Sequence, residues 1–200
     1  MANWKSIRRK IKDSKKTKRA VYNQAKSVVN KEKEILIQKF LAHPVTKEIR
    51  LGPTSENISN TLGGYGNLYT FIGFREGDDP VQDVVNLLNL IVKLKTIKAK
   101  KGNNTTYEMS VQYPSNEEFK IKTPMPWESG RSWVLSVERG ISGFGSYMYK
   151  RVEASRSGKG IQAKKFGEGK EQKIRSGSFR NVKYMSEMIK EFYLNLKKEK

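Results

Sequence analysis

The sequence contains no cysteine, which excludes disulfide bonds, thiolate metal sites and cysteine nucleophiles. It holds a single histidine, His43, so a metal site built from two imidazoles is excluded as well. A lone histidine directly before Pro44 is typical of a structural residue. The lack of cysteine fits a protein made and kept in a reducing cytosol.

Long apolar runs are missing too. The longest, Val84–Leu94, is interrupted by Asn86, Asn89 and Lys93 and is too short to cross a bilayer. The charged N-terminal stretch has no apolar segment of the kind found in signal peptides. We therefore expect a soluble chain without a membrane partner that is intracellular when it is synthesised.

Acidic residues are scarce relative to basic ones. Asp and Glu number 20 against 40 Lys and Arg, so the formal net charge is +20. An excess of this size predicts a polyanionic partner or an acidic protein surface as the binding partner. Hydrophobic residues make up 36% of the chain, which indicates that part of it lies outside the core.

Apolar residues at three- and four-residue steps predict helices over 3–42, 80–94 and 181–197. In the first of these the apolar stripe fails between Lys12 and Ala20, so its second half is expected to pack on the core. Asp79 as N-cap, Pro80 at the first position and Gln82 at the third predict the start of the middle helix.

Shorter apolar or alternating runs predict strands. The expected strands are Val45–Leu51, Leu68–Phe74, Thr96–Lys101, Thr105–Tyr113, Phe119–Thr123, Ser132–Glu138 and Tyr147–Val152, with a hairpin turn at 102–104. The sum is an α+β fold in which helices pack a small antiparallel β-sheet. We divide the chain into a basic N-terminal helix (1–43), an α+β core (44–152), a flexible basic Gly/Ser-rich loop (153–180) and a C-terminal amphipathic helix (181–200).

The stretch TLGGYGNL (residues 61–68) places three glycines around a tyrosine. A phosphate-binding loop needs a lysine and a hydroxyl after the last glycine, but Asn67 and Leu68 follow here. A dinucleotide site needs a strand before the glycines and a helix after them, whereas we expect a polar loop before and a strand after. A bend or a close approach to a neighbouring protein backbone is the favoured interpretation.

The sequence offers little support for other kinds of catalytic or metal-binding site. Asp78 and Asp79 are adjacent, but their place at a helix start is explained by capping and the helix dipole. No serine lies in a GxSxG context, so a hydrolytic triad is not expected. Together these observations predict no catalytic residue, metal site or cofactor.

Nucleic-acid binding is the alternative function, with basic groups at 5–19 and 156–180 to neutralise phosphates and Phe144, Tyr147 and Tyr149 to stack on bases. No RRM, KH, zinc or helix-turn-helix signature accompanies them.

Three stretches resemble virion structural proteins of large tailed phages, of the tail-completion or neck type. They are Phe40–Phe74 (FLAHPVTKEIRLGPTSENISNTLGGYGNLYTFIGF), Trp127–Arg151 (WESGRSWVLSVERGISGFGSYMYKR) and Ser155–Gln162 (SRSGKGIQ). The resemblance implies an α+β subunit without an active site that assembles into a ring at the head–tail junction and docks neighbouring rings. Portal or adaptor proteins and tail terminator or tube proteins would be those neighbours, and the virion would be its location after synthesis in the host cytoplasm.

The resemblance also implies contact residues. Inter-subunit contacts are expected in the glycine loop and the basic segment, at Gly63, Gly64, Tyr65, Gly66, Arg156, Gly158, Gly160 and Gln162. Contacts with DNA or an acidic partner are expected on the first helix, at Arg8, Arg9, Lys10, Lys15, Lys16, Lys18 and Arg19. A tail-tube initiation or baseplate subunit is an alternative placement, and a basic nucleic-acid-binding accessory protein is the alternative of another class.

Overall fold

A computed structural model describes residues 15–62, 66–100, 106–126, 128–139, 146–149, 162–165 and 182–198. The fold is mixed helix and sheet, as predicted. Its helices are α2 (Lys15–Ala42), α3 (Pro44–Arg50), α4 (Leu68–Ile72), α5 (Pro80–Ile91), α6 (Asn116–Lys122), α7 (Trp133–Arg139) and α8 (Met185–Lys198), with a short 3-10 turn at Gly52–Thr54. Its strands are β1 (Lys93–Lys100), β2 (Thr106–Gln112), β3 (Pro124–Met125), β4 (Glu128–Ser132), β5 (Ser146–Tyr149) and β6 (Gln162–Lys165).

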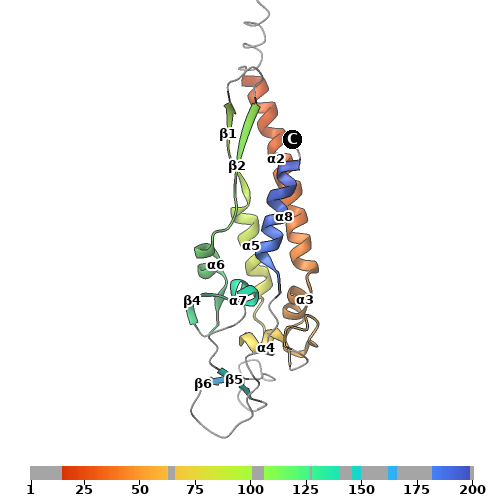
Figure 1. The fold of residues 1–200 in the computed structure, drawn as a ribbon, viewed down its shortest axis with the longest axis vertical. Coiled ribbons are helices and arrows are strands. Elements are labelled where there is room, and N and C mark those ends of the chain that lie inside the picture. The colour runs from red at the N-terminus through yellow and green to blue at the C-terminus, as the bar shows by residue number, and fades with distance from the viewer. Residues whose placement is uncertain are drawn as a thin grey trace, which may run out of the picture.

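The molecule is elongated, and the helices α2, α5 and α8 run along its length (Figure 1). The long N-terminal helix and the amphipathic C-terminal helix are both confirmed, within the residues described. The C-terminal helix buries Met185, Met188, Phe192 and Leu196, which are four members of the predicted stripe. Against α2 it is held by a hydrogen bond from Asn195 Nδ2 to Glu32 Oε2 of 3.1 Å.

The helix α5 begins as predicted. The Asp79 carboxylate accepts a hydrogen bond from the backbone N–H of Gln82 at 3.0 Å, and Pro80 occupies the first turn. The helix ends at Ile91, a few residues before the predicted end, because Lys93 already belongs to β1. Its buried face supplies a large part of the core, at Val81, Val84, Leu87, Leu88 and Ile91.

The predicted hairpin is confirmed as β1 paired antiparallel with β2. The register shifts between Leu94 and Thr96, so Lys95 has no partner on β2. This bulge places Leu94 and Ile97 on the same face of the hairpin although they are three residues apart. Both side chains are half-buried, and Leu94 packs against the core. The bulge thus keeps one apolar face along a strand whose sequence does not alternate strictly.

Four predicted strands are wrong, because these segments are helices. Residues 45–50 lie in α3, where Pro44 occupies the first turn and His43 Nδ1 accepts from the backbone N–H of Val45. Residues 68–72 form α4, which Asn67 caps at its start and which Gly73, in the left-handed conformation with φ 89°, caps at its end. Apolar runs of this length fit a buried helix as well as a buried strand, and the caps decide between them.

The other two corrections have the same cause. Residues 119–122 belong to α6, which begins with a capping box between Ser115 and Glu118. Residues 133–138 belong to α7, and Ser132, the last residue of β4, accepts a hydrogen bond through its hydroxyl from the backbone N–H of Leu135 at 3.3 Å. Serine at such a position satisfies a backbone donor that a strand would have paired with a neighbour.

The last predicted strand, 147–152, coincides in part with β5, which pairs antiparallel with β6. The strand β6 lies within the predicted loop 153–180, and the other residues of this loop lie outside the described part of the chain. Each of the three β-sheets seen among the described residues is a two-stranded pair. The sheet content is therefore divided between short ribbons, and helices supply most of the core.

Aromatic rings occupy the centre of the core. The Trp133 ring lies 5.8 Å from Phe74 in an edge-to-face arrangement and 6.4 Å from Tyr184. Phe40 of α2 lies 5.8 Å from Tyr184, and Tyr69 of α4 lies 5.4 Å from Phe74. These rings come from α2, α4, the residues just after α4, α7 and the residue just before α8, so one cluster connects elements far apart in sequence.

Candidate inter-subunit surface

The loop between α3 and α4 is anchored at two points by one carboxylate. Glu48 of α3 is fully buried, at 0% exposure. Its Oε2 accepts a hydrogen bond from the backbone N–H of Ser59 at 2.7 Å, and its Oε1 accepts one from Leu68 at 2.7 Å. Hydrogen bonds to an ionised acceptor are stronger than neutral ones, particularly where water is excluded. The two loop positions flanking the glycines are thus held to α3.

Asn67 adds a second set of anchors at the end of the same loop. Its Nδ2 donates to the backbone carbonyls of Pro53 at 3.0 Å and Ser55 at 2.9 Å. Its Oδ1 accepts from the backbone N–H of Thr70 at 3.0 Å and so caps α4. One buried side chain therefore joins the start of the loop, its end and the following helix.

Of the glycine loop itself, Gly63, Gly64 and Tyr65 lie outside the described residues. Gly66 is exposed and has φ 67°, a left-handed conformation that glycine adopts without strain. Leu62 before the loop is buried at 3% exposure, and Leu68 after it at 0%. The glycines are consequently attached at both ends to a firmly packed base.

The structure corrects one reason for rejecting a phosphate cradle here, because a helix, α4, does follow the glycines. Two contacts nevertheless occupy the start of that helix. The N–H of Leu68 donates to Glu48, and the N–H of Thr70 donates to Asn67. A phosphate would have to displace a buried carboxylate of the same charge, so the protein's own acid already takes the anion position.

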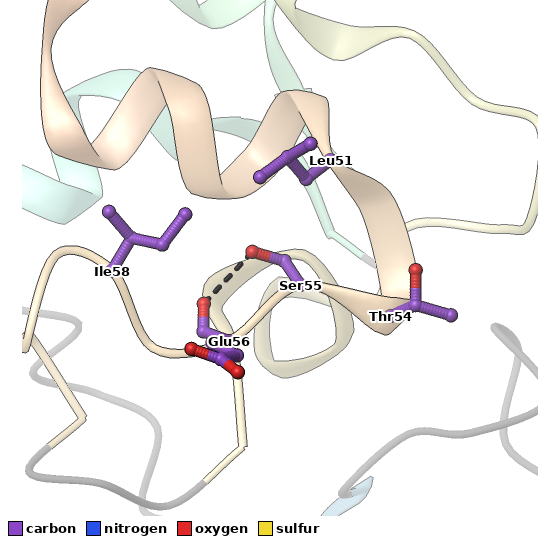
Figure 2. A pocket seen from close by; sticks show the side chains of 5 residues that line it. All are labelled: Leu51, Thr54, Ser55, Glu56 and Ile58. Carbon is purple, nitrogen blue, oxygen red and sulfur yellow. Dashed lines mark hydrogen bonds between the residues drawn. The ribbon is translucent and has the colours of Figure 1, made fainter.

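An open groove of about 290 Å³ lies beside this loop and is lined by Leu51, Thr54, Ser55, Glu56 and Ile58. Figure 2 shows Leu51 and Ile58 on the side of the groove next to the helix, with Ser55 and Glu56 opposite. The Ser55 hydroxyl donates to the Glu56 carbonyl at 2.9 Å. Leu51 is 60% exposed and Ile58 45% exposed. Two aliphatic side chains are thus presented to solvent around a hollow.

Asn57, which lies between the groove-lining residues Glu56 and Ile58 in the sequence, has an unusual environment. Its Nδ2 and Oδ1 atoms are both shielded from solvent, and neither has a hydrogen-bond partner in the described structure. A buried amide without partners costs free energy, of the order of 1–3 kcal/mol.

His43 has a structural role in capping and packing, as its position directly before Pro44 predicted. Its Nδ1 accepts from Val45 N–H at 3.3 Å, and its ring lies 4.8 Å from that of Tyr184. Burial lowers the pKa of His43, and this effect is opposed by a backbone hydrogen bond at Lys183 and the charge of Glu187. Burial also raises the pKa of Tyr184, whose hydroxyl lies 2.6 Å from that of Thr46.

Asp79 has the capping role that was predicted for the acidic pair at 78–79, whereas Asp78 bonds within the turn that precedes α5. The Asp78 carboxylate accepts from the backbone N–H of Arg75 at 2.7 Å, while Asp79 caps α5. Burial raises the pKa of the nearby Asp83, helped by the negative charges of Asp79 and Asp78. Among the described residues, no group of three His, Asp or Glu side chains is placed to hold a metal ion.

The basic candidates are partly described. Lys15, Lys16, Lys18 and Arg19 all lie exposed on the first turns of α2. Arg8, Arg9 and Lys10 lie outside the described residues, as do Arg156, Gly158 and Gly160. Gln162 belongs to β6, where it pairs with Tyr149 of β5. No helix within the described ranges is long and apolar enough to span a bilayer.

Sequence reasoning missed Glu48 and Asn67, although they organise the candidate surface. The signal available for Glu48 was a carboxylate among Val45, Thr46 and Ile49, which is unusual for a buried face. Asn67 directly before an apolar run was a signal for an N-cap.

Compared with known proteins, the chain matches no protein-family model, no curated protein and no solved structure.

Proposed function

We propose that this protein is a structural subunit of a tailed-phage virion, which assembles into a ring at the head–tail junction and docks adjacent rings. The observation that carries the proposal is the anchored loop 51–68. Glu48 ties its residues Ser59 and Leu68 to α3, and exposed Leu51 and Ile58 line a groove beside it. A surface that is both fixed and apolar loses little conformational entropy on binding another protein.

The resemblance to neck proteins supports the same surface. Its first stretch, Phe40–Phe74, contains Glu48, the groove and the glycine loop. A ring requires one patch on each subunit to meet a different patch on the next. We place one of these patches on the loop 51–68.

The test changes the groove without touching the core. We expect the purified chain to form an oligomer that persists from about 0.15 M to about 0.5 M salt, because apolar packing is little screened by ions. Leu51→Asp combined with Ile58→Asp is expected to give folded monomers that still unfold in one cooperative transition, at a lower melting temperature because association no longer stabilises them. Light scattering after size-exclusion chromatography measures both species.

Ile121→Asp is the matched control, since Ile121 of α6 is 71% exposed and lies away from the groove. This variant should keep the oligomer. A wild-type chain that remains monomeric, or a control that dissociates as readily as the groove variant, would contradict the assigned surface. Mass spectrometry and microscopy of purified virions then test the location, and absence from the particle overturns the proposed function.

A further inference from the structure

Three segments that are distant in sequence bring basic side chains to one end of the molecule. The first half of α2 contributes Lys15, Lys16, Lys18, Arg19, Lys26 and Lys31, all exposed. The hairpin strand β1 packs beside this half of α2 and contributes exposed Lys93, Lys95 and Lys98 (Figure 1). We call these residues, together with two lysines of α8, the basic end.

The end of α8 reaches the same place because it runs antiparallel to α2. The contact from Asn195 to Glu32 fixes the last turns of α8 beside the middle of α2. Lys197 and Lys198 follow in the direction of the α2 N-terminus, and both are exposed. The Lys197 ammonium lies 4.5 Å from the centroid of the Tyr193 ring.

Counter-charges are almost absent from this region. The stretches 15–31, 93–98, 106–112 and 192–198 contain one carboxylate, that of Glu108, which lies opposite Lys98 in the hairpin register. The first acid along α2 is Glu32, which is buried and bonded to Asn195. Like charges gathered without partners repel one another and disfavour the compact state. A polyanion bound at this end would remove that repulsion.

The layout favours a nucleic-acid backbone over an acidic protein. From Lys15 to Lys31 the helix extends about 24 Å, at about 1.5 Å per residue, and it carries cations along that length. Duplex DNA offers a similarly extended row of charges, about one for every 1.7 Å of its axis. Lysine predominates among these cations, and lysine is depleted at protein–protein interfaces but common at phosphates.

Tyr22 lies within this array. Lys15, Arg19, Tyr22 and Lys26 follow one another at four- and three-residue steps, so they share one side of α2. The Tyr22 side chain is 42% exposed, and its hydroxyl is a further donor suited to a phosphate oxygen. Point charges and a single hydroxyl provide no pattern for reading bases.

We propose that the basic end binds the phosphate backbone of duplex DNA without sequence selectivity. This inference does not rest on the proposed ring function, since the basic end and the groove beside Leu51 are separate surfaces. Binding would be dominated by the release of counterions from the DNA, so it should weaken steeply with added salt.

The experiment measures binding of the full-length chain to a short random-sequence duplex by fluorescence anisotropy. We expect a slope of log affinity against log salt of about −5 or steeper, which is a loss of about 1,000-fold between 50 and 200 mM salt. The combined variant Lys15→Gln, Arg19→Gln, Lys26→Gln and Lys95→Gln should reduce the slope by about three to four. Glutamine keeps a helix propensity close to that of lysine and arginine, so α2 should stay folded.

The matched control removes the same charge elsewhere. It combines Lys47→Gln, Arg50→Gln, Arg139→Gln and Lys190→Gln, which are exposed positions on α3, α7 and α8. We expect this control to keep the wild-type slope within about one unit. Circular dichroism melting of both variants checks that each is folded.

Three results would overturn the proposal. One is a wild-type slope shallower than about −2, which would mean too few phosphate contacts. Another is an equal loss of affinity in the control, which would assign binding to net charge alone. The third is binding to poly-L-glutamate as tight as to DNA of equal charge, which would assign the basic end to an acidic protein.

Discussion

At the scale of single residues, Glu48 shows how a very basic protein uses a buried carboxylate as an internal ligand. Two backbone N–H groups, from Ser59 and Leu68, converge on it from opposite ends of one loop. A carboxylate offers two equivalent acceptor oxygens, which matches two donors. A fully buried ionised group is tolerated because its hydrogen bonds replace those it would make with water.

Glu48→Gln tests this role. Glutamine presents one oxygen and one NH₂ group, so one of the two backbone donors would face another donor. We expect a loss of about 2–3 kcal/mol in the free energy of unfolding. Urea denaturation measures it. Glu56→Gln, at an exposed carboxylate in the same loop, should change stability by less than about 0.5 kcal/mol.

Equal effects of these two substitutions would show that the carboxylate is not an anchor. Limited proteolysis adds a local readout, because release of the loop end should expose the chain between Ser59 and Leu68 to cleavage in the Glu48→Gln variant. The wild type should resist cleavage there under the same conditions.

At the scale of elements, capping side chains decide the identity of the short segments. His43, Asn67, Ser115 and Ser132 each accept a hydrogen bond from a backbone N–H at the start of a helix. Each of these side chains pairs with an N–H group that has no backbone acceptor in the first turn of a helix. These contacts are worth about 1 kcal/mol apiece, which is enough to choose between helix and strand in a run of five to seven residues.

In the long helix α2, the exposed first turns and the buried later residues occupy different parts of the helix. Its buried residues begin at Ala25, and positions 15–20 are exposed apart from half-buried Thr17. Deletion of residues 1–20 should therefore leave unfolding cooperative and lower the melting temperature by no more than about 5 °C, as expected for a change near 1 kcal/mol. Differential scanning calorimetry checks this expectation, and a broad non-cooperative transition would contradict it.

At the scale of the whole molecule, the chain is an elongated body whose helices share one aromatic and aliphatic core (Figure 1). The core cluster includes residues from α2 at one end of the sequence and α8 at the other. The exposed surface is unevenly charged, with cations of α2, β1 and α8 gathered at the basic end. Because the core is shared, we expect the helices to unfold together.

Phe192→Ala tests that cooperativity. Phe192 of α8 is 4% exposed and belongs to the core cluster, so its truncation should cost about 3–5 kcal/mol. The melting curve followed by far-ultraviolet and by aromatic circular dichroism should shift as a single transition. Tyr193→Ala, at a neighbouring side chain that is 50% exposed, serves as the control and should have a much smaller effect. Separate transitions for the two probes would show that α8 unfolds independently.

Local periodicity and local caps were sufficient for the larger elements. The stripes of α2 and α8, the Asp79–Pro80 start of α5 and the hairpin around residues 102–104 were all predictable. In these cases the deciding contacts join residues within about one helical turn or on two strands that follow one another in the sequence. The charge excess likewise follows from composition, and so does the expectation of an anionic partner.

The short helices, the Glu48 anchor and the basic end were decided by tertiary structure alone. Runs such as Leu68–Ile72 are too short for periodicity to separate a helix from a strand, so packing and caps made the choice. The Glu48 anchor joins residues 11 and 20 positions away. The basic end combines segments from both termini and the middle of the chain. Such arrangements depend on which elements share a core, and a sequence read in short windows does not contain that information.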